Sequence, residues 1–286
     1  MLRGLQISLV TIFSPHVSSS LGAVRRPGMK AITANGIDYH YEIHGQGEPL
    51  VLLHGGLMNS EMWGPTLPAL AAHHKVIAID LQGHGRTPLG DRPIRLPAIA
   101  DDLDIVLEKL GVGPVDVMGY SFGGGIAFRL AVQHPARVRR LVIVSACPWQ
   151  DAFYPEMLPQ QAALGAAMLE MTKQTPMYQS YVKIAPRPED FGCLLDAMGD
   201  WMRQPFDWRA DVANVKAQTL LVFGDSDMFQ LDKVIELYKL FGGGQRDAGW
   251  MREHMAKNRL AILPDVTHYE MGVSPKLVDA VEAFLR

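Results

Sequence analysis

One serine in this sequence stands where a hydrolytic nucleophile would be expected. Ser121 lies in the stretch GYSFG at residues 119–123, after the apolar run 115–118 and before a helical pattern that begins at Phe122. A serine at a sharp strand-to-helix turn needs small residues two positions on either side, and its hydroxyl then projects above the sheet. The N-terminus of the helix directs free N–H groups toward charge developing there. We therefore predict that Ser121 is a nucleophile.

A serine hydroxyl is almost un-ionised at neutral pH, so it needs a base. Among ten histidines, His268 is the best placed, because it follows the apolar run 260–263 in a loop just before the last helical stretch. Two others have different predicted roles. His54 ends an apolar run and leads into a glycine pair, and His84 lies between glycines and is expected to stabilise a turn.

The imidazole of such a base needs a carboxylate that fixes its tautomer and stabilises the imidazolium. The sequence GDSD at residues 224–227 follows the apolar run 219–223 and offers two aspartates. We choose Asp227 and keep Asp225 as the alternative. The resulting chain order of serine, aspartate and histidine is the one expected when the serine lies on a strand-to-helix turn of this kind.

A tetrahedral oxyanion needs two fixed backbone N–H donors. One should belong to Phe122, the residue after the nucleophile. The other is expected in the glycine-rich stretch HGGL at residues 54–57, where the backbone can approach a substrate closely; Gly56 is our choice and Leu57 the second. This chemistry requires no metal and no organic cofactor.

The elements that must position these residues alternate between strands and helices. The dipeptide at residues 35–36, Asn-Gly, predicts a two-residue hairpin turn at the start of the domain. The apolar runs that follow suit a parallel sheet buried on both faces, and the helical patterns between them predict an α/β fold with right-handed crossovers. Expected strands are 31–34, 37–43, 50–53, 76–79, 115–118, 138–144 and 219–223; expected helices are 61–72, 97–110, 122–134 and 275–285.

The alternation stops between residues 148 and 215, where the chain is rich in methionine, aromatic residues and proline. We interpret 148–215 as an inserted lid, and 29–147 with 216–286 as the core. Methionine and aromatic side chains line adaptable apolar pockets, although most of them here are expected to pack within the lid. The composition of this segment favours a small hydrophobic ester as substrate.

The first 28 residues precede the domain-like sequence that opens at Met29. Arg3 and the apolar stretch 5–13 resemble a signal peptide, but Leu21 stands where a cleavage site needs a small residue. We interpret 1–28 as a dispensable leader and expect a cytoplasmic protein. A secreted or periplasmic location is the alternative if these residues act as a signal peptide.

Composition excludes several other classes of protein. Of the 286 residues, 48% are hydrophobic and 20% charged, as in a globular chain with a sizeable core, and the net charge is −3. The sequence has no basic stripe, so we do not expect it to bind nucleic acid. It also has no apolar run long enough for stable membrane insertion. The two cysteines, Cys147 and Cys193, are interpreted as free thiols in a reducing compartment. The oligomeric state stays open, with a homodimer as one option.

Together these motifs resemble the α/β-hydrolase superfamily, in particular its small bacterial esterases, C–C bond hydrolases and cofactor-free haloperoxidases. The resemblance covers nearly all of residues 30–286. It implies an eight-stranded, mostly parallel sheet with a helical lid inserted after the sixth strand. One departure is the long separation of Asp227 from His268, whose excess we place in a flexible insertion around 241–249. The motifs are LLHGG at 52–56, DLQGHGRT at 80–87, GYSFGG at 119–124, LVFGDSD at 221–227 and DVTHYE at 265–270.

The resemblance also narrows the reaction. Related dehalogenases and epoxide hydrolases would need an aspartate at position 121, so alkyl halides and epoxides are excluded as substrates. The hypothesis is a carboxylesterase that acts on hydrophobic acyl or aryl esters through an acyl-enzyme. Cleavage of C–C bonds in ring-cleavage products and perhydrolase or haloperoxidase chemistry would use the same triad. A ligand receptor with little turnover is the alternative from another class.

Overall fold

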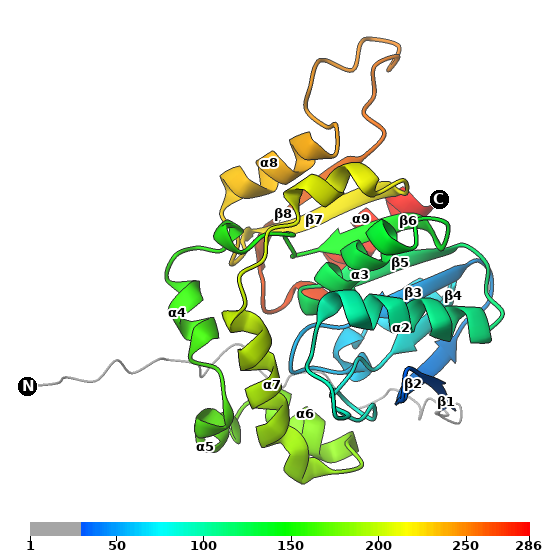
Figure 1. Ribbon diagram of the computed structural model, residues 1–286. Coiled ribbons are helices and arrows are strands. Elements are labelled where there is room, and N and C mark those ends of the chain that lie inside the picture. Colours follow the sequence, from blue (N-terminus) through cyan, green and yellow to red (C-terminus); the bar gives the residue numbers. More distant parts are fainter. Residues whose placement is uncertain (1–29) are drawn as a thin grey trace, which may run out of the picture.

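The computed structural model describes residues 30–286, so the expectations for residues 1–28 lie outside the described part. Its centre is one eight-stranded sheet in the order β1-β2-β4-β3-β5-β6-β7-β8 (Figure 1). Strands β1 and β2 pair antiparallel, as do β2 and β4, and the remaining neighbours are parallel. The expected mostly parallel sheet is therefore confirmed. The strands are β1 Lys30–Ala34, β2 Ile37–His44, β3 Pro49–Leu53, β4 Lys75–Ile79, β5 Val115–Tyr120, β6 Val138–Val144, β7 Gln218–Ser226 and β8 Arg259–Thr267.

The parallel strands form because their side chains are apolar on both faces. Every residue of β5 is buried, and β3 is buried from its second residue onward. In this register Leu53 is paired with Gly119 of β5 and with Ile79 of β4, so neighbouring strands end at the same edge of the sheet. Loops that carry polar residues leave the sheet at that edge, as expected for a parallel sheet.

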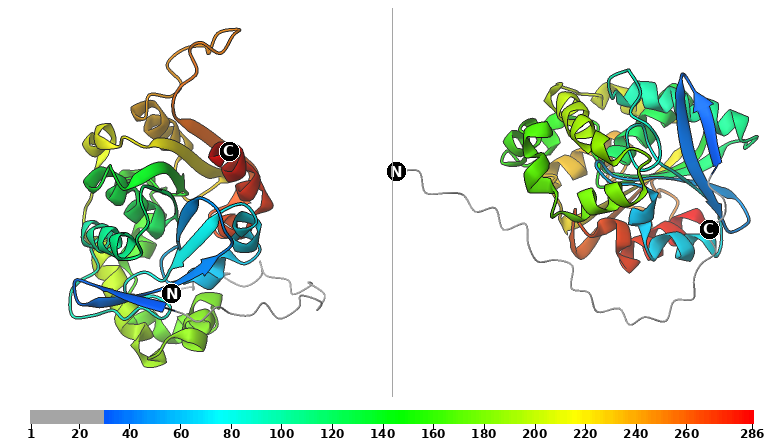
Figure 2. Two further views of the ribbon diagram at one scale, coloured as in Figure 1. Left: turned by 90° about the vertical axis from the view of Figure 1, so that its right-hand side faces the viewer. Right: turned by 90° about the horizontal axis from the view of Figure 1, so that it is seen from below.

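Helices cover both faces of the sheet (Figure 2). The buried side chains of α2, α3 and α8 belong to one apolar core, and those of α1 and α9 belong to a second core on the opposite face. Two closed faces explain why the strands carry continuous apolar runs and no polar alternation. The helices outside the inserted segment are α1 Thr66–Ala71, α2 Leu96–Lys109, α3 Phe122–Gln133, α8 Leu231–Leu240 and α9 Pro275–Leu285, with 3₁₀ turns η1 Ser60–Trp63 and η6 Met271–Val273.

The prediction of one continuous helix at 61–72 was wrong. The predicted helix 61–72 is a 3₁₀ turn, η1, followed by the short helix α1. Between them Gly64 adopts a φ of 40°, and Pro65 has no N–H with which to continue a helical hydrogen-bond ladder. The chain therefore changes direction at this point, although the apolar periodicity continues across it.

The chain between β6 and β7 is helical, and we call residues 148–215 the cap segment. It forms α4 Met157–Ala162, α5 Leu169–Thr172, α6 Pro176–Ile184 and α7 Phe191–Arg203, joined by 3₁₀ turns η2 Gln150–Ala152, η3 Ala166–Met168, η4 Pro188–Asp190 and η5 Arg209–Asn214. Within these residues strand pairing is limited to isolated bridges, such as the one between Trp149 and Asp207. The predicted absence of a clear strand is thus confirmed.

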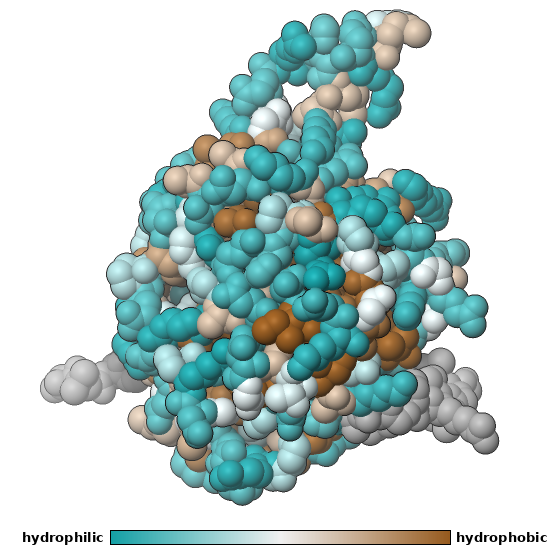
Figure 3. Space-filling view, turned by 45° about the vertical axis from the view of Figure 1, so that its right-hand side comes forward, coloured by the Kyte–Doolittle hydropathy of each residue, from teal (hydrophilic) through white to brown (hydrophobic). Residues whose placement is uncertain are grey.

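A long connection, residues 241–258, joins α8 to β8 and projects from the body of the protein (Figures 1 and 3). We call it the arm loop. It contains the glycine-rich stretch in which the extra length between Asp227 and His268 was expected. Across residues 30–286 we find no helix with the length and apolar character needed to span a bilayer.

Candidate active site

Ser121 lies at the turn between β5 and α3, in a backbone conformation that few residues adopt. Its φ is 53° and its ψ is −116°. The glycines two positions away are required by close packing: a Cβ at Gly119 would collide with the Gly123 carbonyl, and one at Gly123 would collide with the carbonyls of Leu53 and His54. Such local strain persists only where the surroundings fix it. The predicted turn is therefore present, and the hydroxyl lies at the carboxyl edge of the sheet.

His268 bridges the serine and an aspartate by its two ring nitrogens. Nε2 lies 3.0 Å from Ser121 Oγ, and Nδ1 lies 2.9 Å from Asp227 Oδ1. Both His268 and Asp227 are buried, with 5% and 9% of their surface exposed. The carboxylate thus fixes the tautomer with the proton on Nδ1, which leaves Nε2 free to accept a proton from the serine. The structure brings together all three residues that the sequence predicted.

Asp227 accepts several hydrogen bonds besides that from His268. Ser145 Oγ donates to its Oδ2 at 2.5 Å, the Met228 N–H donates to Oδ1 at 2.8 Å, and the Gly224 N–H lies 3.3 Å from Oδ2. Burial alone would raise the pKa of this carboxyl, but the hydrogen bonds and the nearby imidazole outweigh it and hold the pKa below its usual value. Asp227 is therefore kept ionised beside the imidazole.

The alternative acid, Asp225, has a different environment. It is exposed, and its carboxylate accepts hydrogen bonds from the N–H groups of Asp265 at 3.1 Å and Val266 at 3.4 Å. These bonds hold the end of β7 against the irregular end of β8. The structure thus places Asp227, and not Asp225, against the imidazole.

The two predicted oxyanion donors belong to residues that lie side by side. A Cβ on Gly56 would lie 3.6 Å from the Cβ of Phe122, and the Gly123 N–H donates to the His54 carbonyl at 3.1 Å. Among the described residues, no acceptor takes a hydrogen bond from the N–H of Gly56 or Phe122. Two free amides on neighbouring residues, one of which directly follows Ser121, are suited to bind a developing negative charge together. Leu57, the second choice, has a φ of 59° in the following turn.

The two competing histidines are structural. His54 is buried; its Nδ1 donates to the Gly55 carbonyl at 2.8 Å, and its Nε2 accepts from the Leu81 N–H at 3.0 Å. Burial lowers the pKa of His54 to about 4, so the ring is neutral at pH 7. His84 donates from Nδ1 to the Gln82 carbonyl at 2.8 Å, and burial lowers its pKa to about 3. Neither reaches the serine by a hydrogen bond.

The cap segment reaches the two predicted oxyanion donors through helix α7. A Cβ on Gly56 would lie 2.9 Å from Met198 Cε, and the ring of Trp201 packs edge-on against Phe122 at 5.3 Å. Two apolar side chains of the cap therefore adjoin Gly56 and Phe122. Other aromatic residues of the cap pack among themselves or against the core, as in the pairs Tyr178–Phe191, Tyr181–Phe191, Phe206–Trp208 and Phe128–Trp208.

Two residues at this site were missed by reasoning from the sequence. Ser145 follows β6, has a φ of 49° and donates to the acid. The hydroxyl of Tyr120 donates to the backbone carbonyl of His268 at 2.5 Å, and its ring lies 5.1 Å from the imidazole. A sequence signal for Ser145 was available, because it follows β6, the strand that lies between β5, which precedes Ser121, and β7, which precedes Asp227. Tyr120 has no comparable signal, because the position between the first glycine and the serine of the G-x-S-x-G pattern admits any residue.

The described residues 30–286 contain no group of three or more His, Cys, Asp and Glu side chains arranged to hold a metal ion. Both cysteines of this part are free thiols, with Cys147 buried and Cys193 exposed.

Comparison with known proteins gives consistent matches. A family model described as the alpha/beta hydrolase fold matches residues 48–246. A pimeloyl-[acyl-carrier protein] methyl ester esterase of Legionella pneumophila (strain Lens) is 25% identical over 256 residues, covering 83% of this chain and 97% of that protein. An (E)-2-((N-methylformamido)methylene)succinate hydrolase of Acinetobacter baylyi is 34% identical over 106 residues, covering 37% of this chain and 40% of that protein.

Solved structures share the same fold at low sequence identity. The crystal structure of an E-2-(acetamidomethylene)succinate hydrolase has a TM-score of 0.69 and 18% identity, covering 90% of this chain and 98% of that chain. A serine hydrolase involved in carbazole degradation has a TM-score of 0.69 and 23% identity with the same coverage. These likenesses extend over both the sheet and the helices that flank it.

Proposed function

The chain belongs to the alpha/beta hydrolase fold family, and we propose that it is a serine carboxylesterase that cleaves hydrophobic acyl or aryl esters. The observation that carries this proposal is the unbroken hydrogen-bond chain from Asp227 through His268 to Ser121. The two unpaired amides beside the serine add to it, because an acyl-transfer site needs both a nucleophile and donors for the oxyanion.

The reaction follows from the positions of these groups. Ser121 Oγ attacks the ester carbonyl carbon while its proton passes to His268 Nε2, and the carbonyl oxygen becomes an oxyanion held by the amides of Gly56 and Phe122. Collapse of this intermediate breaks the bond to the alcohol, which leaves with the proton from Nε2. Water then gives a proton to Nε2 and attacks the acyl-enzyme, and the acid is released as Ser121 recovers its proton. Asp227 stabilises the imidazolium in both halves.

The apolar substrate class is supported by what surrounds the oxyanion donors. Met198 and Trp201 approach them from the cap segment, and we propose that this segment serves as a lid over the acyl group. Burying a methylene group contributes about 0.8 kcal/mol, so apolar acyl chains gain binding energy against such a surface. The named activity of the Legionella relative, hydrolysis of a methyl ester, supports a small alcohol as the leaving group.

The test is labelling with a fluorophosphonate probe followed by intact-mass spectrometry, together with hydrolysis of p-nitrophenyl acetate, butyrate and octanoate. We expect one covalent adduct on the native protein and none on Ser121→Ala. The exposed Ser226 provides the matched control, and Ser226→Ala should label and turn over normally. A native chain that stays unlabelled and inert would reject the esterase and favour the ligand-receptor alternative.

The same site could cleave C–C bonds or form peracids, so the competing substrates are assayed in parallel. Decay of a dienoate ring-cleavage product, followed by its ultraviolet absorbance, measures C–C hydrolysis, and peroxide-dependent halogenation in acetate measures perhydrolysis. The proposal requires kcat/KM for an ester to exceed the values for both. A larger value for the dienoate would reassign the site to C–C hydrolysis without changing the nucleophile.

The contact between α7 and the oxyanion donors predicts how acyl preference can be changed. Replacing the buried Met198 by alanine opens space beside Gly56, so we expect the ratio of octanoate to acetate turnover to rise by about threefold to tenfold. Truncation of a buried methionine also lowers the free energy of unfolding, by about 2–5 kcal/mol, and the assays are therefore run well below the melting temperature. An unchanged ratio in a folded variant would show that the acyl group lies elsewhere.

A further inference from the structure

The arm loop, residues 241–258, carries large apolar side chains where nothing covers them. Trp250 is 97% exposed, Met251 is 80% exposed and Met255 is 38% exposed. The loop stands clear of the sheet and its helices (Figures 1 and 3). Single exposed apolar residues are ordinary on protein surfaces, but a tryptophan and two methionines gathered on a projecting loop indicate a surface that meets a partner.

The arm loop has its own internal structure. The carboxylate of Asp247 accepts from the Gly249 N–H at 2.8 Å, and that of Glu253 accepts from the Met251 N–H at 3.0 Å. The His254 N–H donates to the Ala248 carbonyl at 2.8 Å. Both acidic side chains of the loop are thus occupied by its own backbone. These bonds hold the tip in one shape and reduce the entropy lost when it binds a partner.

The basic side chain at the tip has no such partner. Arg252 is exposed next to the apolar pair, and among residues 30–286 no carboxylate lies within ion-pair distance of it. The loop is joined to the body near its base, for example by the hydrogen bond from the Thr219 N–H to Asn258 Oδ1 at 2.7 Å. The tip therefore offers apolar surface and one unpaired positive charge.

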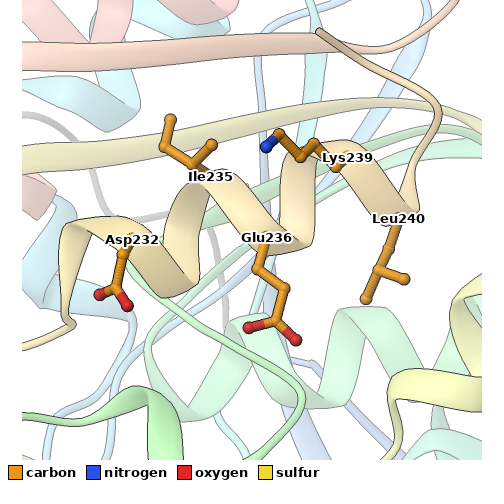
Figure 4. Close-up of a pocket in the computed structure, with 5 residues that line it drawn as sticks. All are labelled: Asp232, Ile235, Glu236, Lys239 and Leu240. Atoms are coloured by element: carbon orange, nitrogen blue, oxygen red, sulfur yellow. The ribbon is translucent and has the colours of Figure 1, made fainter. Parts of the chain in front are cut away.

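A complementary groove lies on the helix from which the arm loop begins. It has a volume of about 590 Å³ and runs along α8, where Asp232, Glu236 and Leu240 project from one side (Figure 4). Ile235 and the aliphatic part of Lys239 complete its lining. Its apolar surface, which can receive the apolar side chains of the tip, is flanked by the carboxylates of Asp232 and Glu236 and by the ammonium of Lys239.

The charges of the groove are also complementary to those of the tip. Glu236 is already paired with Arg209 at 3.3 Å and with Lys233 at 3.3 Å. Asp232 is exposed, and within the described part of the chain no cation lies within ion-pair distance of it. The groove therefore presents apolar side chains, the unpaired carboxylate of Asp232 at one end and the ammonium of Lys239 toward the other, so Arg252 is matched by the Asp232 end (Figure 4).

We propose that two copies of this chain form a dimer by exchanging arm loops, each covering the α8 groove of the other. A chain's own tip does not fill its own groove, since Trp250 is almost fully exposed in the single chain. Because the tip and the groove are both present on every copy, one two-fold axis satisfies both contacts at once and the assembly closes at two subunits. In this dimer Trp250 and Met251 cover Ile235 and Leu240, and Arg252 pairs with Asp232 of the second copy.

The size of this contact indicates a dimer that responds to concentration. A tryptophan side chain buries about 150–250 Å², and the symmetry doubles every contribution. With the methionines and the two groove surfaces included, the total approaches the lower bound of about 1,200 Å² for a specific interface. The native protein should therefore shift from monomer to dimer within the micromolar range.

Sedimentation velocity of the full chain over this range tests the proposal. Truncation of a buried interface tryptophan weakens binding by at least about 30-fold, and each dimer contains two, so Trp250→Ala should weaken dimerisation by about 10³-fold. Met171→Ala, an exposed methionine of the cap segment, is the matched control and should dimerise as the native chain does. Because the tip lies on the surface, Trp250→Ala should keep the native circular dichroism spectrum and melting temperature.

A charge exchange tests which surfaces meet. Arg252→Asp and Asp232→Arg should each weaken dimerisation, and the double variant should restore it, since the pair is re-formed with its signs reversed. A monomer at every concentration, a dimer insensitive to Trp250→Ala, or a double variant no better than the singles would overturn the proposal. So would a monomer that sediments with anionic phosphatidylserine vesicles through Trp250, which would assign the loop to a membrane surface. None of these readouts depends on ester hydrolysis.

Discussion

The hydroxyl of Ser145 gives the sharpest way to test how the acid of the site is held. Its Oγ donates to Asp227 Oδ2 at 2.5 Å, and both residues are buried. Ser145→Ala removes this donor and keeps the Cβ, so the positive-φ backbone at this position is strained equally in both proteins. The substitution therefore isolates one hydrogen bond to a buried carboxylate.

The expected losses of stability and activity follow from the hydrogen bond that is removed and from those that remain. A hydrogen bond to a charged group contributes about 1.5–3 kcal/mol, so the free energy of unfolding at pH 7 should fall by that amount. Asp227 keeps its bond to His268 and those from the N–H groups of Met228 and Gly224, so it stays ionised and near its position. We expect kcat/KM to fall about tenfold, which corresponds to about 1.4 kcal/mol of transition-state stabilisation.

The pH dependence separates a positioning role from a packing role. The pKa of Asp227 is lowered in the folded protein, so its ionised form stabilises the fold above its unfolded pKa of about 4, and this contribution is lost as the pH falls through the folded value. Losing the Ser145 donor raises the folded pKa. The difference in unfolding free energy between the two proteins should therefore be full at pH 7 and shrink as the pH falls below about 4.

The assay is urea unfolding and p-nitrophenyl butyrate hydrolysis measured from acid to neutral pH. Ser226→Ala, which removes an exposed hydroxyl from the end of β7 next to Asp227, is the control and should match the native protein. Ser145→Gly also loses the hydroxyl but relieves the backbone, so it should be more stable than the alanine variant and equally slow. Native kcat/KM in Ser145→Ala, or a stability loss independent of pH, would refute the reasoning.

Two further substitutions test the elements around the serine. Tyr120→Phe leaves the buried carbonyl of His268 without its hydrogen-bond donor. It should therefore lower the free energy of unfolding by about 1–3 kcal/mol and lower kcat more than it changes KM. Tyr269→Phe, on an exposed ring, is the control and should change neither. Gly123→Ala forces a methyl group onto two backbone carbonyls and should abolish labelling by the fluorophosphonate probe, while Gly113→Ala, with open space around it, should leave labelling unchanged. Normal kinetics in Tyr120→Phe, or normal labelling in Gly123→Ala, would show that these contacts do not position the site.

The sequence was sufficient to locate the three residues of the hydrogen-bond chain because each lies within a few residues of the end of an apolar run. In a parallel sheet the carboxyl ends of the strands meet at one edge, so residues far apart along the chain were expected to converge. The spacing of the glycines around Ser121 added the local backbone conformation. The choice between Asp225 and Asp227 was different, since both follow the apolar run 219–223 and only the packing of β8 against β7 separates them.

Other features depended on contacts that local patterns do not encode. The helix expected at 61–72 is interrupted, because Gly64 and Pro65 act on the backbone while the apolar periodicity continues. Helix α8 was not among the expected helices, although its groove carries the proposed dimer contact. The roles of Ser145 and Tyr120 arise from partners 82 and 148 residues away along the chain.

The sequence by itself determined the α/β architecture and which strands are followed by polar residues. Hydrophobic periodicity and glycine positions indicate these features because they act through the local backbone. It also determined which serine could occupy the strained turn. Only the tertiary structure decided which aspartate faces His268, which side chains of the cap adjoin the predicted oxyanion donors, and that the extra length before β8 forms an exposed arm. These outcomes depend on packing between distant segments, where shape and the satisfaction of buried polar groups select one arrangement among several that the sequence pattern allows.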